Sequence, residues 1–412
     1  MKYGCIGEHL KHSFSKEIHN SLGGYEYELK EIPKDMFSSF MINREFLAIN
    51  VTIPYKEEVI PYLYYIDDAA REIGAVNTVV NKDGKLYGYN TDFYGMNMLL
   101  CHAGIELKNK KVAILGTGGT SKTARAVAKS LMAKEIIVVS RTGKNNSITY
   151  EKLYENHSDV DVIINTTPSG MFPDNFKKPV EINDFKNLSG VIDAVYNPLE
   201  TRLIRDAKKR GIKAEGGLYM LVAQGVLASE IFLEKKYEKE RLEEIFKELK
   251  RKKENIVLVG MPSSGKSTVG KEIAKTFLRK FYDTDEEIEK KYGNIPSDII
   301  TSKGEEYFRK IESDVVSELS KETGCVIATG GGVVLKEENV ESLMQNGRIY
   351  FLNRPVDLLL PTKDRPLTST KEALIKKYNE RYAIYEKSAH IKIDASGNVD
   401  EVVNAVTGDF KR

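Results

Sequence analysis

Two nucleotide-binding signatures of different chemical type lie far apart in this chain of 412 residues. Residues 260–268 spell the phosphate loop G-x-x-x-x-G-K-[ST] directly after the apolar run 256–259. A glycine-rich turn at residues 116–119 follows a second apolar run, 112–115. In both, glycines let backbone N–H groups approach phosphate oxygens where a helix begins. The pattern predicts two enzymes joined end to end.

Length and composition agree with this division. A chain of 412 residues suits two or three domains. With 41% hydrophobic and 30% charged residues we expect a globular protein. Because the formal net charge is only +2, we expect no overall electrostatic attraction to nucleic acid or membranes. No apolar tract is long enough for a membrane span or a signal peptide. We therefore expect a cytoplasmic location and small-molecule partners, and leave the oligomeric state open.

The three cysteines, Cys5, Cys101 and Cys325, are too widely separated for a disulfide framework or a zinc site. We expect buried, unreactive thiols. A charged helix with an apolar stripe is predicted between residues 229 and 255, where Leu242, Ile245, Phe246 and Leu249 keep helical spacing. This helix marks a boundary near residue 254, and a solvated helix without a recognition role is its simplest interpretation.

Strand-like and helix-like segments alternate from residue 110 onward. Apolar strands are expected at 111–115, 136–140, 160–165 and 190–194, a rhythm typical of a doubly wound parallel sheet. Earlier strands are expected at 47–51 and 76–80, the latter leading into a turn at 81–84.

The end of the second strand of this sheet indicates the cofactor. Where NAD enzymes carry an acidic residue for the ribose hydroxyls, the sequence reads Ser140-Arg141-Thr142, with Lys144 nearby. A cation suits a 2′-phosphate, so we predict NADP. The alternative is that Arg141 is an exposed cation at a strand end.

Residues 1 to about 235 resemble shikimate dehydrogenase. The resemblance rests on ordered motifs: residues 12–20 (His-Ser-Phe-Ser followed by His-Asn), 50–56 (Asn-Val-Thr-Ile-Pro-Tyr-Lys), 74–78, 88–95, the glycine turn, 165–171, 193–198 and 216–224. It implies that Lys56 and Asp92 form the catalytic pair. An ammonium group beside a reacting ketone can stabilise and protonate the oxygen that gains charge.

The same resemblance implies the ligand-binding residues. Those that would contact substrate are Ser13, Ser15, Asn50, Thr52, Asn77, Tyr196 and Gln224. Those that would contact NADP are Gly116, Gly118, Gly119, Thr120, Ser140, Arg141, Thr142 and Gly217. Taken singly they have simpler explanations: Lys56 as a surface lysine, Asp92 as a helix N-cap, and the asparagines and serines as loop residues. His9 and Lys16 replace prolines of the family pattern, and Ser140 replaces an asparagine.

Residues 254 to about 395 resemble shikimate kinase through the phosphate loop and motifs at 281–285, 304–312, 328–332, 364–367 and 381–385. The resemblance implies ATP and Mg²⁺. The phosphate-binding residues would be Gly260, Ser263, Ser264, Gly265, Lys266, Ser267 and Thr268, with Ser267 and Asp283 on the metal. Substrate would be bound by Asp285, Arg309, Gly331 and Arg381, and Arg365 would join Lys266 in catalysis. Asp283 and Arg309 could instead be a plain strand-end acid and a helix-surface cation.

Two departures concern this second half. Ala383 replaces a proline of the family pattern, and the lid expected between about residues 355 and 370 is short and lacks an arginine ahead of Asp364. These departures leave the closing of the lid and the strength of the kinase activity open.

Together the resemblances imply a bifunctional enzyme of aromatic amino acid (chorismate) biosynthesis, because they name consecutive reactions. The expected class is α/β throughout: a substrate domain (1–100 and 218–235), a Rossmann NADP domain (101–217), a charged linker (236–253) and a phosphate-loop kinase domain with a parallel sheet (254–412). One alternative keeps both folds but uses quinate or another polyol as substrate. Another makes one half a non-catalytic nucleotide-binding module.

Overall fold

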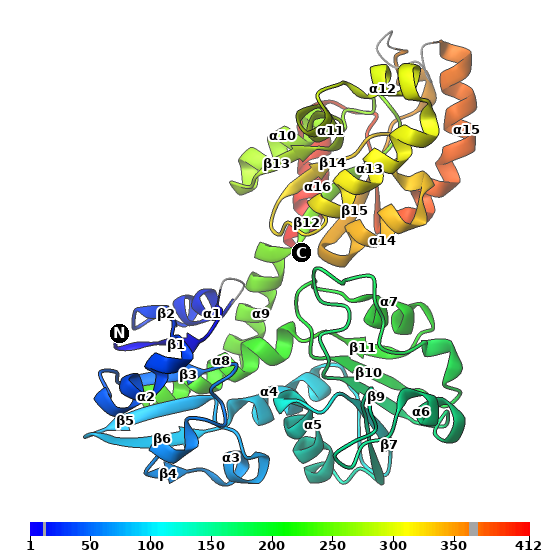
Figure 1. The fold of residues 1–412 in the computed structure, drawn as a ribbon. Helices are drawn as coiled ribbons and strands as arrows, with labels where there is room; N and C mark the ends of the chain where they lie inside the picture. Colours follow the sequence, from blue (N-terminus) through cyan, green and yellow to red (C-terminus); the bar gives the residue numbers. More distant parts are fainter. Residues whose placement is uncertain (11–13, 362–369) are drawn as a thin grey trace. The chain divides into compact units, whose positions relative to one another are not determined.

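The computed structural model describes residues 1–10, 14–361 and 370–412. The chain divides into two compact units, Met1–Leu249 and Lys250–Arg412 (Figure 1). The division falls within helix α9 (Lys239–Lys253). It thus lies inside the segment 236–253 that the sequence predicts as a linker.

The first sheet of unit 1 has the strand order β2-β1-β3-β5-β6-β4. β1 pairs in parallel with β2 and β3, whereas β5 is antiparallel to β3 and β6. Asp83 and Gly84, both at positive φ, form the two-residue turn between β5 and β6, as hairpins of this length favour. The strands are β1 (Tyr3–Gly7), β2 (Tyr27–Glu31), β3 (Ala48–Val51), β4 (Tyr65–Ile66), β5 (Thr78–Lys82) and β6 (Lys85–Tyr89). The helices are α1 (Ser15–Leu22), α2 (Lys34–Asn43), α3 (Asp68–Ile73) and α4 (Thr91–His102), with a 3₁₀ turn at Ile60–Tyr62.

The second sheet of unit 1 is entirely parallel, in the order β11-β10-β9-β7-β8. Its central strands are buried on both faces, which explains their continuous apolar sequences. The strands are β7 (Lys111–Leu115), β8 (Glu135–Val139), β9 (Val162–Asn165), β10 (Gly190–Asp193) and β11 (Lys213–Glu215). The helices are α5 (Gly119–Ser130), α6 (Tyr150–Asn156) and α7 (Arg202–Lys209), with a 3₁₀ turn at Ile182–Asp184. The doubly wound prediction is confirmed.

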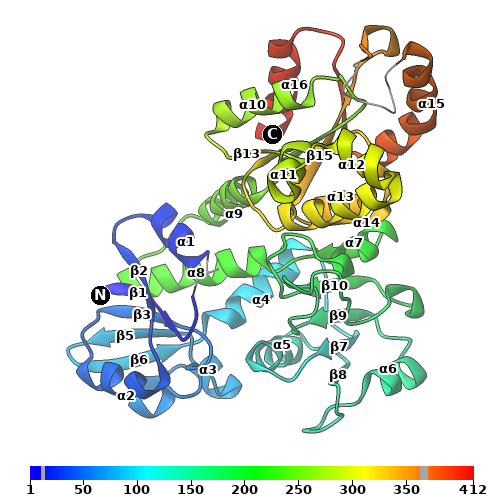
Figure 2. The ribbon, with the colours of Figure 1, turned by 45° about the horizontal axis from the view of Figure 1, so that its top comes forward.

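Helix α8 (Leu218–Leu233) returns from the second sheet to the first and packs along α4 (Figure 2). Gly95 of α4 makes this close approach possible, because a Cβ there would lie 2.7 Å from the carbonyl oxygen of Met220. The apolar stripe of α9 is buried in the same core as α4 and α8. The predicted apolar spacing of this helix thus contributes to unit 1.

Unit 2 contains a parallel five-stranded sheet in the order β13-β14-β12-β15-β16. Its strands are β12 (Asn255–Val259), β13 (Phe281–Asp283), β14 (Val326–Ala328), β15 (Gly347–Asn353) and β16 (Ile391–Asp394). Its helices are α10 (Lys266–Phe277), α11 (Thr284–Tyr292), α12 (Pro296–Lys303), α13 (Glu305–Leu319), α14 (Glu337–Asn346), α15 (Lys371–Ser388) and α16 (Val399–Lys411), with 3₁₀ turns at Val333–Leu335 and Val356–Leu358. The predicted α/β class with a parallel kinase sheet is confirmed.

The expectation of three buried cysteines is wrong for one of them. Cys5 and Cys325 are buried, but Cys101, near the end of α4, is exposed because its side chain lies on the face of that helix away from the core. Among the described residues, no helix is both long and apolar enough to cross a membrane.

Candidate active sites

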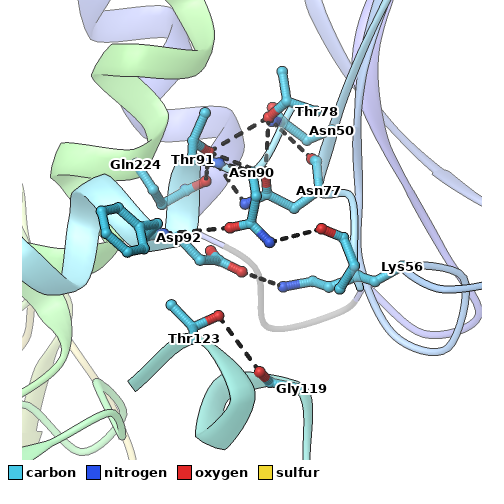
Figure 3. Close-up of polar contacts among 12 residues, drawn as sticks. Asn50, Lys56, Asn77, Thr78, Asn90, Thr91, Asp92, Gly119, Thr123 and Gln224 are labelled. Carbon is cyan, nitrogen blue, oxygen red and sulfur yellow. Dashed lines mark hydrogen bonds and ion pairs between the residues drawn. The ribbon is translucent and has the colours of Figure 1, made fainter. Parts of the chain in front are cut away.

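The predicted catalytic pair is brought together. Lys56 lies in the turn region after β3 and Asp92 in the first turn of α4, and Lys56 Nζ donates to Asp92 Oδ2 at 2.6 Å (Figure 3). Both side chains are partly accessible, 24% and 15% exposed, as groups that must meet a ligand should be. Asp92 is not the N-cap of α4. Asn90 is, since its Oδ1 accepts from the N–H of Phe93.

A group of amides and hydroxyls lies beside this pair (Figure 3). The Thr91 N–H donates to Asn77 Oδ1 at 2.8 Å, Asn77 Nδ2 donates to Thr91 Oγ1 at 3.1 Å, and Gln224 Oε1 lies 3.3 Å from that hydroxyl. Asn50 Nδ2 donates to Thr78 Oγ1 at 3.1 Å. The structure therefore gathers Asn50, Asn77 and Gln224 from β3, the start of β5 and α8, a set of donors and acceptors suited to ring hydroxyls.

Three further predicted substrate residues lie on segments of the same unit. Thr52 directly follows β3, and its N–H donates to the Ile6 carbonyl at 3.0 Å. Ser15 is the first residue of α1. Tyr196 lies in the loop after β10, with its ring 5.4 Å from that of Phe14, and burial raises its pKa. Ser13 lies outside the described residues.

The glycine turn after β7 has the geometry of a phosphate cradle. Gly116 adopts φ +110°, and Gly118 is the N-cap of α5. A Cβ on Gly118 or Gly119 would meet no atom within 4 Å, so the space before the helix N-terminus is open. Thr120 follows in the first turn. These residues fit a pyrophosphate, because the helix supplies N–H groups and a positive dipole end.

The segment after β8 is ordered by Ser140. Its hydroxyl lies 2.7 Å from that of Ser147 and accepts from the N–H of Gly143 at 3.0 Å. Arg141 and Thr142 are exposed at the end of this strand, next to β7 and its glycine turn. Gly217, the N-cap of α8, has a steric role as well, since a Cβ there would lie 2.2 Å from the Ala194 carbonyl oxygen.

The phosphate loop of unit 2 follows β12. Gly260 and Gly265 have positive φ, and so has Ser263 at +65°. Lys266 Nζ donates to the carbonyls of Gly260 and Met261, at 2.9 and 2.8 Å, and the side chain is buried. The buried Ser264 hydroxyl has no hydrogen-bond partner within the described part of the chain. An unsatisfied hydroxyl in a loop of N–H groups fits a bound phosphate.

The predicted metal-binding residues also meet. Ser267 Oγ donates to Asp283 Oδ2 at 2.5 Å at the start of α10, and Thr268 follows in the helix. Asp283 Oδ1 accepts from the N–H of Asp285 at 3.0 Å. One hydroxyl and one carboxylate fit Mg²⁺, which keeps most of its waters and takes few protein ligands in kinases. No cluster of three or more His, Cys, Asp or Glu suited to a metal occurs in the ranges that the structure describes.

Glycines 330–332 place the predicted acceptor-binding groups. A Cβ on Gly332 would lie 2.0 Å from Arg309 Nη1, and one on Gly330 would lie 2.8 Å from Asp285 Oδ1. The carbonyl of Gly331 accepts from Arg381 Nη1 at 3.0 Å. Asp285, Arg309 and Arg381 therefore lie around one glycine segment at the end of β14.

Two carboxylates hold the Arg309 guanidinium. Nη1 donates to Glu312 Oε2 at 2.7 Å and Nη2 to Glu305 Oε1 at 2.9 Å. Burial lowers the pKa of Arg309, but these carboxylates, chiefly Glu312, outweigh it and leave the pKa raised. Burial raises the pKa of Glu312, and the positive charge of Arg309 limits this rise. Arg309 is therefore a fixed cation. Arg365 and half of the expected lid, residues 362–369, lie outside the described residues.

Known proteins resemble both units. The family model for the shikimate dehydrogenase substrate binding domain matches residues 5–79, and that for shikimate kinase matches residues 262–410. A shikimate dehydrogenase (NADP(+)) of Clostridium perfringens is 39% identical over 267 residues, which cover 60% of this chain and 98% of that relative. The chain belongs to the shikimate dehydrogenase family.

Solved structures of shikimate dehydrogenases agree. Shikimate dehydrogenase 1 of Peptoclostridium difficile is 35% identical with a TM-score of 0.56, and covers 60% of this chain and 98% of its own. A chorismate mutase/shikimate 5-dehydrogenase fusion protein of Clostridium acetobutylicum is 37% identical with a TM-score of 0.57. This match covers 61% of the present chain and 97% of the solved chain. The C-terminal unit, beyond this shikimate dehydrogenase part, has the shikimate kinase fold.

The sequence predictions did not include several residues that hold these sites. Thr78 and Thr91 bridge the shikimate dehydrogenase amides, and Glu312 orients Arg309. The sequence pattern that could have indicated the two threonines is the repeated Asn-Thr pair at 77–78 and 90–91, whose threonines begin β5 and α4. For Glu312, the signal was its position three residues after Arg309 on one helix, where oppositely charged side chains meet.

Proposed function

We propose that this chain reduces 3-dehydroshikimate to shikimate with NADPH and then phosphorylates shikimate with ATP to give shikimate 3-phosphate. The observation that carries the proposal is the 2.6 Å contact of Lys56 with Asp92 beside a group of amides, in a chain whose second unit matches shikimate kinase. The oxidoreductase and kinase classes follow from the families. The substrates, the site residues and the domain limits 1–100 with 218–235, 101–217, 236–253 and 254–412 are proposed.

In the first reaction, NADPH when bound supplies the hydride. Lys56 stabilises the negative charge that develops on the ketone oxygen and gives it a proton, while Asp92 keeps the ammonium group in place. Asn50, Thr52, Asn77 and Gln224 bind the ring hydroxyls. Ser13 and Ser15 bind the carboxylate, and Tyr196 lies close to the substrate.

The cofactor residues follow the same geometry. Gly116, Gly118, Gly119 and Thr120 line the pyrophosphate site at the start of α5. Arg141 binds the 2′-phosphate, with Ser140 and Thr142 beside it, and Gly217 keeps α8 close to the loop after β10.

In the second reaction, Asp285 binds the ring hydroxyls and orients the one that attacks. Arg309 and Arg381 bind the substrate carboxylate, a task that suits planar forks of donors. Lys266 and Arg365 neutralise charge on the transferred phosphoryl group, and Ser267 with Asp283 would hold Mg²⁺, which would supply further positive charge for the phosphates of ATP.

A coupled assay tests the proposal. The purified chain is given 3-dehydroshikimate, NADPH, ATP and Mg²⁺, and shikimate 3-phosphate is measured by mass spectrometry. Its appearance requires both reactions. Quinate with NADP, and other polyols with ATP, are run in parallel. Faster turnover of those compounds would replace the proposed substrates, and ATP binding without phosphate transfer would make the second unit a non-catalytic module. A cytoplasmic location stays a prediction.

A further inference from the structure

An aromatic cluster lies behind the amides of the proposed shikimate site. Its members are His19 of α1, Tyr25 and Tyr27 at β2, and Phe232 of α8. The His19 ring is 1% exposed and stacks on that of Tyr27, with centroids 3.9 Å apart and an angle of 5° between the planes. A buried imidazole stacked this closely on a phenol fixes the position of that phenol.

Tyr27 connects the histidine to the proposed substrate site. Its hydroxyl donates to Asn50 Oδ1 at 2.6 Å, across strand β1, which lies between β2 and β3. This bond sets the orientation of the Asn50 amide. Because the amide oxygen faces Tyr27, the Nδ2 donor points to Thr78.

His19 is itself held from two sides. Its Nδ1 and the hydroxyl of Tyr25 form a hydrogen bond. On the other side the ring meets α8 at Gly225, the residue after Gln224, where an added Cβ would lie 3.9 Å from Nε2 and 2.9 Å from Ile18 Cγ2. The histidine thus fills the space between β2 and the helix that carries another proposed substrate residue.

We propose that His19 is a positioning residue for shikimate binding, which acts through Tyr27 to fix the hydroxyl-binding amide of Asn50. The inference rests on the proposed dehydrogenase function. Burial lowers the pKa of His19 to about 3, against a smaller rise from the Asn50 amide, so the ring stays neutral wherever the enzyme is assayed. A neutral ring can stack on Tyr27 without a buried charge.

The test compares steady-state shikimate oxidation by the full-length wild type, His19→Leu and Tyr27→Phe. We expect both variants to raise the KM for shikimate roughly tenfold, the effect of losing about one well-placed hydrogen bond, with kcat and the KM for NADP⁺ within about twofold. Ile18→Val, a buried neighbour on the same helix, is the matched control and should leave the KM unchanged. Tyr27→Phe keeps the ring, so it stays informative if His19→Leu folds poorly.

A double-mutant cycle separates positioning from general damage. On an Asn50→Ala background, His19→Leu should change the KM by less than about twofold, because the group that it positions is gone. On a Ser15→Ala background its effect should stay roughly tenfold. Equal effects on both backgrounds, or losses confined to kcat or NADP⁺ binding, would overturn the role of His19 while the proposed function stands. A wild-type chain that does not oxidise shikimate would overturn both.

Discussion

Lys56 and Asp92, 36 residues apart in the chain, meet with 2.6 Å between Nζ and Oδ2. The carboxylate lies in the first turn of α4 and Lys56 lies in the turn region after β3, so the fold of unit 1 holds the Lys56 amine in one position. An amine held in this way beside a carboxylate is placed to exchange a proton with a ligand oxygen.

The first prediction concerns this pair. Lys56→Ala should lower kcat for shikimate oxidation roughly 100- to 10,000-fold, the range for loss of a general acid, because no other ammonium group lies within 4 Å of Asp92 among the described residues. Initial rates of NADPH formation measure the effect. ATP-dependent phosphorylation by the same sample should be unchanged.

The reciprocal variant is the control for that prediction. Lys266→Ala should abolish phosphoryl transfer and leave shikimate oxidation at the wild-type rate, because Lys266 belongs to the phosphate loop of unit 2. Loss of both activities in either variant would show that the two sites depend on each other.

Arg141 should determine the choice of cofactor. Arg141→Ala removes an exposed guanidinium after β8, so we expect the KM for NADP⁺ to rise roughly tenfold with little change in the KM for NAD⁺. Parallel titrations with the two cofactors measure the ratio. Lys152→Ala, at an exposed lysine of α6, is the control for nonspecific loss of positive charge. An equal effect on both cofactors would place the 2′-phosphate elsewhere.

Gly332 should matter for binding of the acceptor. A Cβ there would lie 2.0 Å from Arg309 Nη1, so Gly332→Ala displaces the guanidinium from the carboxylates of Glu312 and Glu305. Because Glu312 is buried, this displacement also lowers stability. We expect the KM for shikimate in the kinase reaction to rise roughly tenfold with the KM for ATP unchanged, and the melting temperature to fall by several degrees. An unaltered KM for shikimate would remove Arg309 from the carboxylate site.

Acid should destabilise unit 1 through His19. Its pKa is about 3 in the folded protein and 6.5 in the unfolded chain. Between these values the unfolded chain binds one more proton than the folded protein. The contribution of His19 to the free energy of unfolding is therefore fully present above pH 6.5 and falls by about 1.4 kcal/mol for each pH unit below it. Burial raises the pKa of its neighbours Tyr25 and Tyr27, so neither titrates in this range.

Comparison with His19→Phe isolates this contribution. Between pH 7.5 and pH 5 the free energy of unfolding of the wild type should fall by about 2 kcal/mol more than that of the variant. Urea denaturation followed by hydrogen exchange in β1 to β3 measures both. A constant difference between the two proteins would mean that the imidazole has the same pKa in the folded and unfolded states.

The strands that the sequence predicted best are those buried on both faces. β7 has the predicted limits, and β9 begins two residues later than predicted, because continuous apolar runs mark such strands clearly. β2, at a sheet edge, alternates polar and apolar residues and was not predicted. The short strands β4, β11 and β13 are no more than three residues long, too few for a periodic pattern.

The motifs indicated the candidate site residues but not their supporting contacts. Lys56 and Asp92 each have an ordinary local explanation, and only the fold shows that they meet. The bond from Tyr27 to Asn50 crosses an intervening strand, so it depends on the sheet order, which no local pattern encodes. Gly95 is a further example. A glycine within a helix lowers the stability of that helix, and only the packing of α8 on α4 shows why no side chain fits at this position.

The close packing of α8 on α4 at Gly95 joins two segments that are synthesised far apart in time. Asn50, Lys56, Asn77 and Asp92 leave the exit tunnel early, but Gln224 follows only after the whole parallel sheet of unit 1 has been synthesised. A nascent chain that ends before α8 would therefore contain Lys56 and Asp92 without the helix that packs on α4 and carries Gln224.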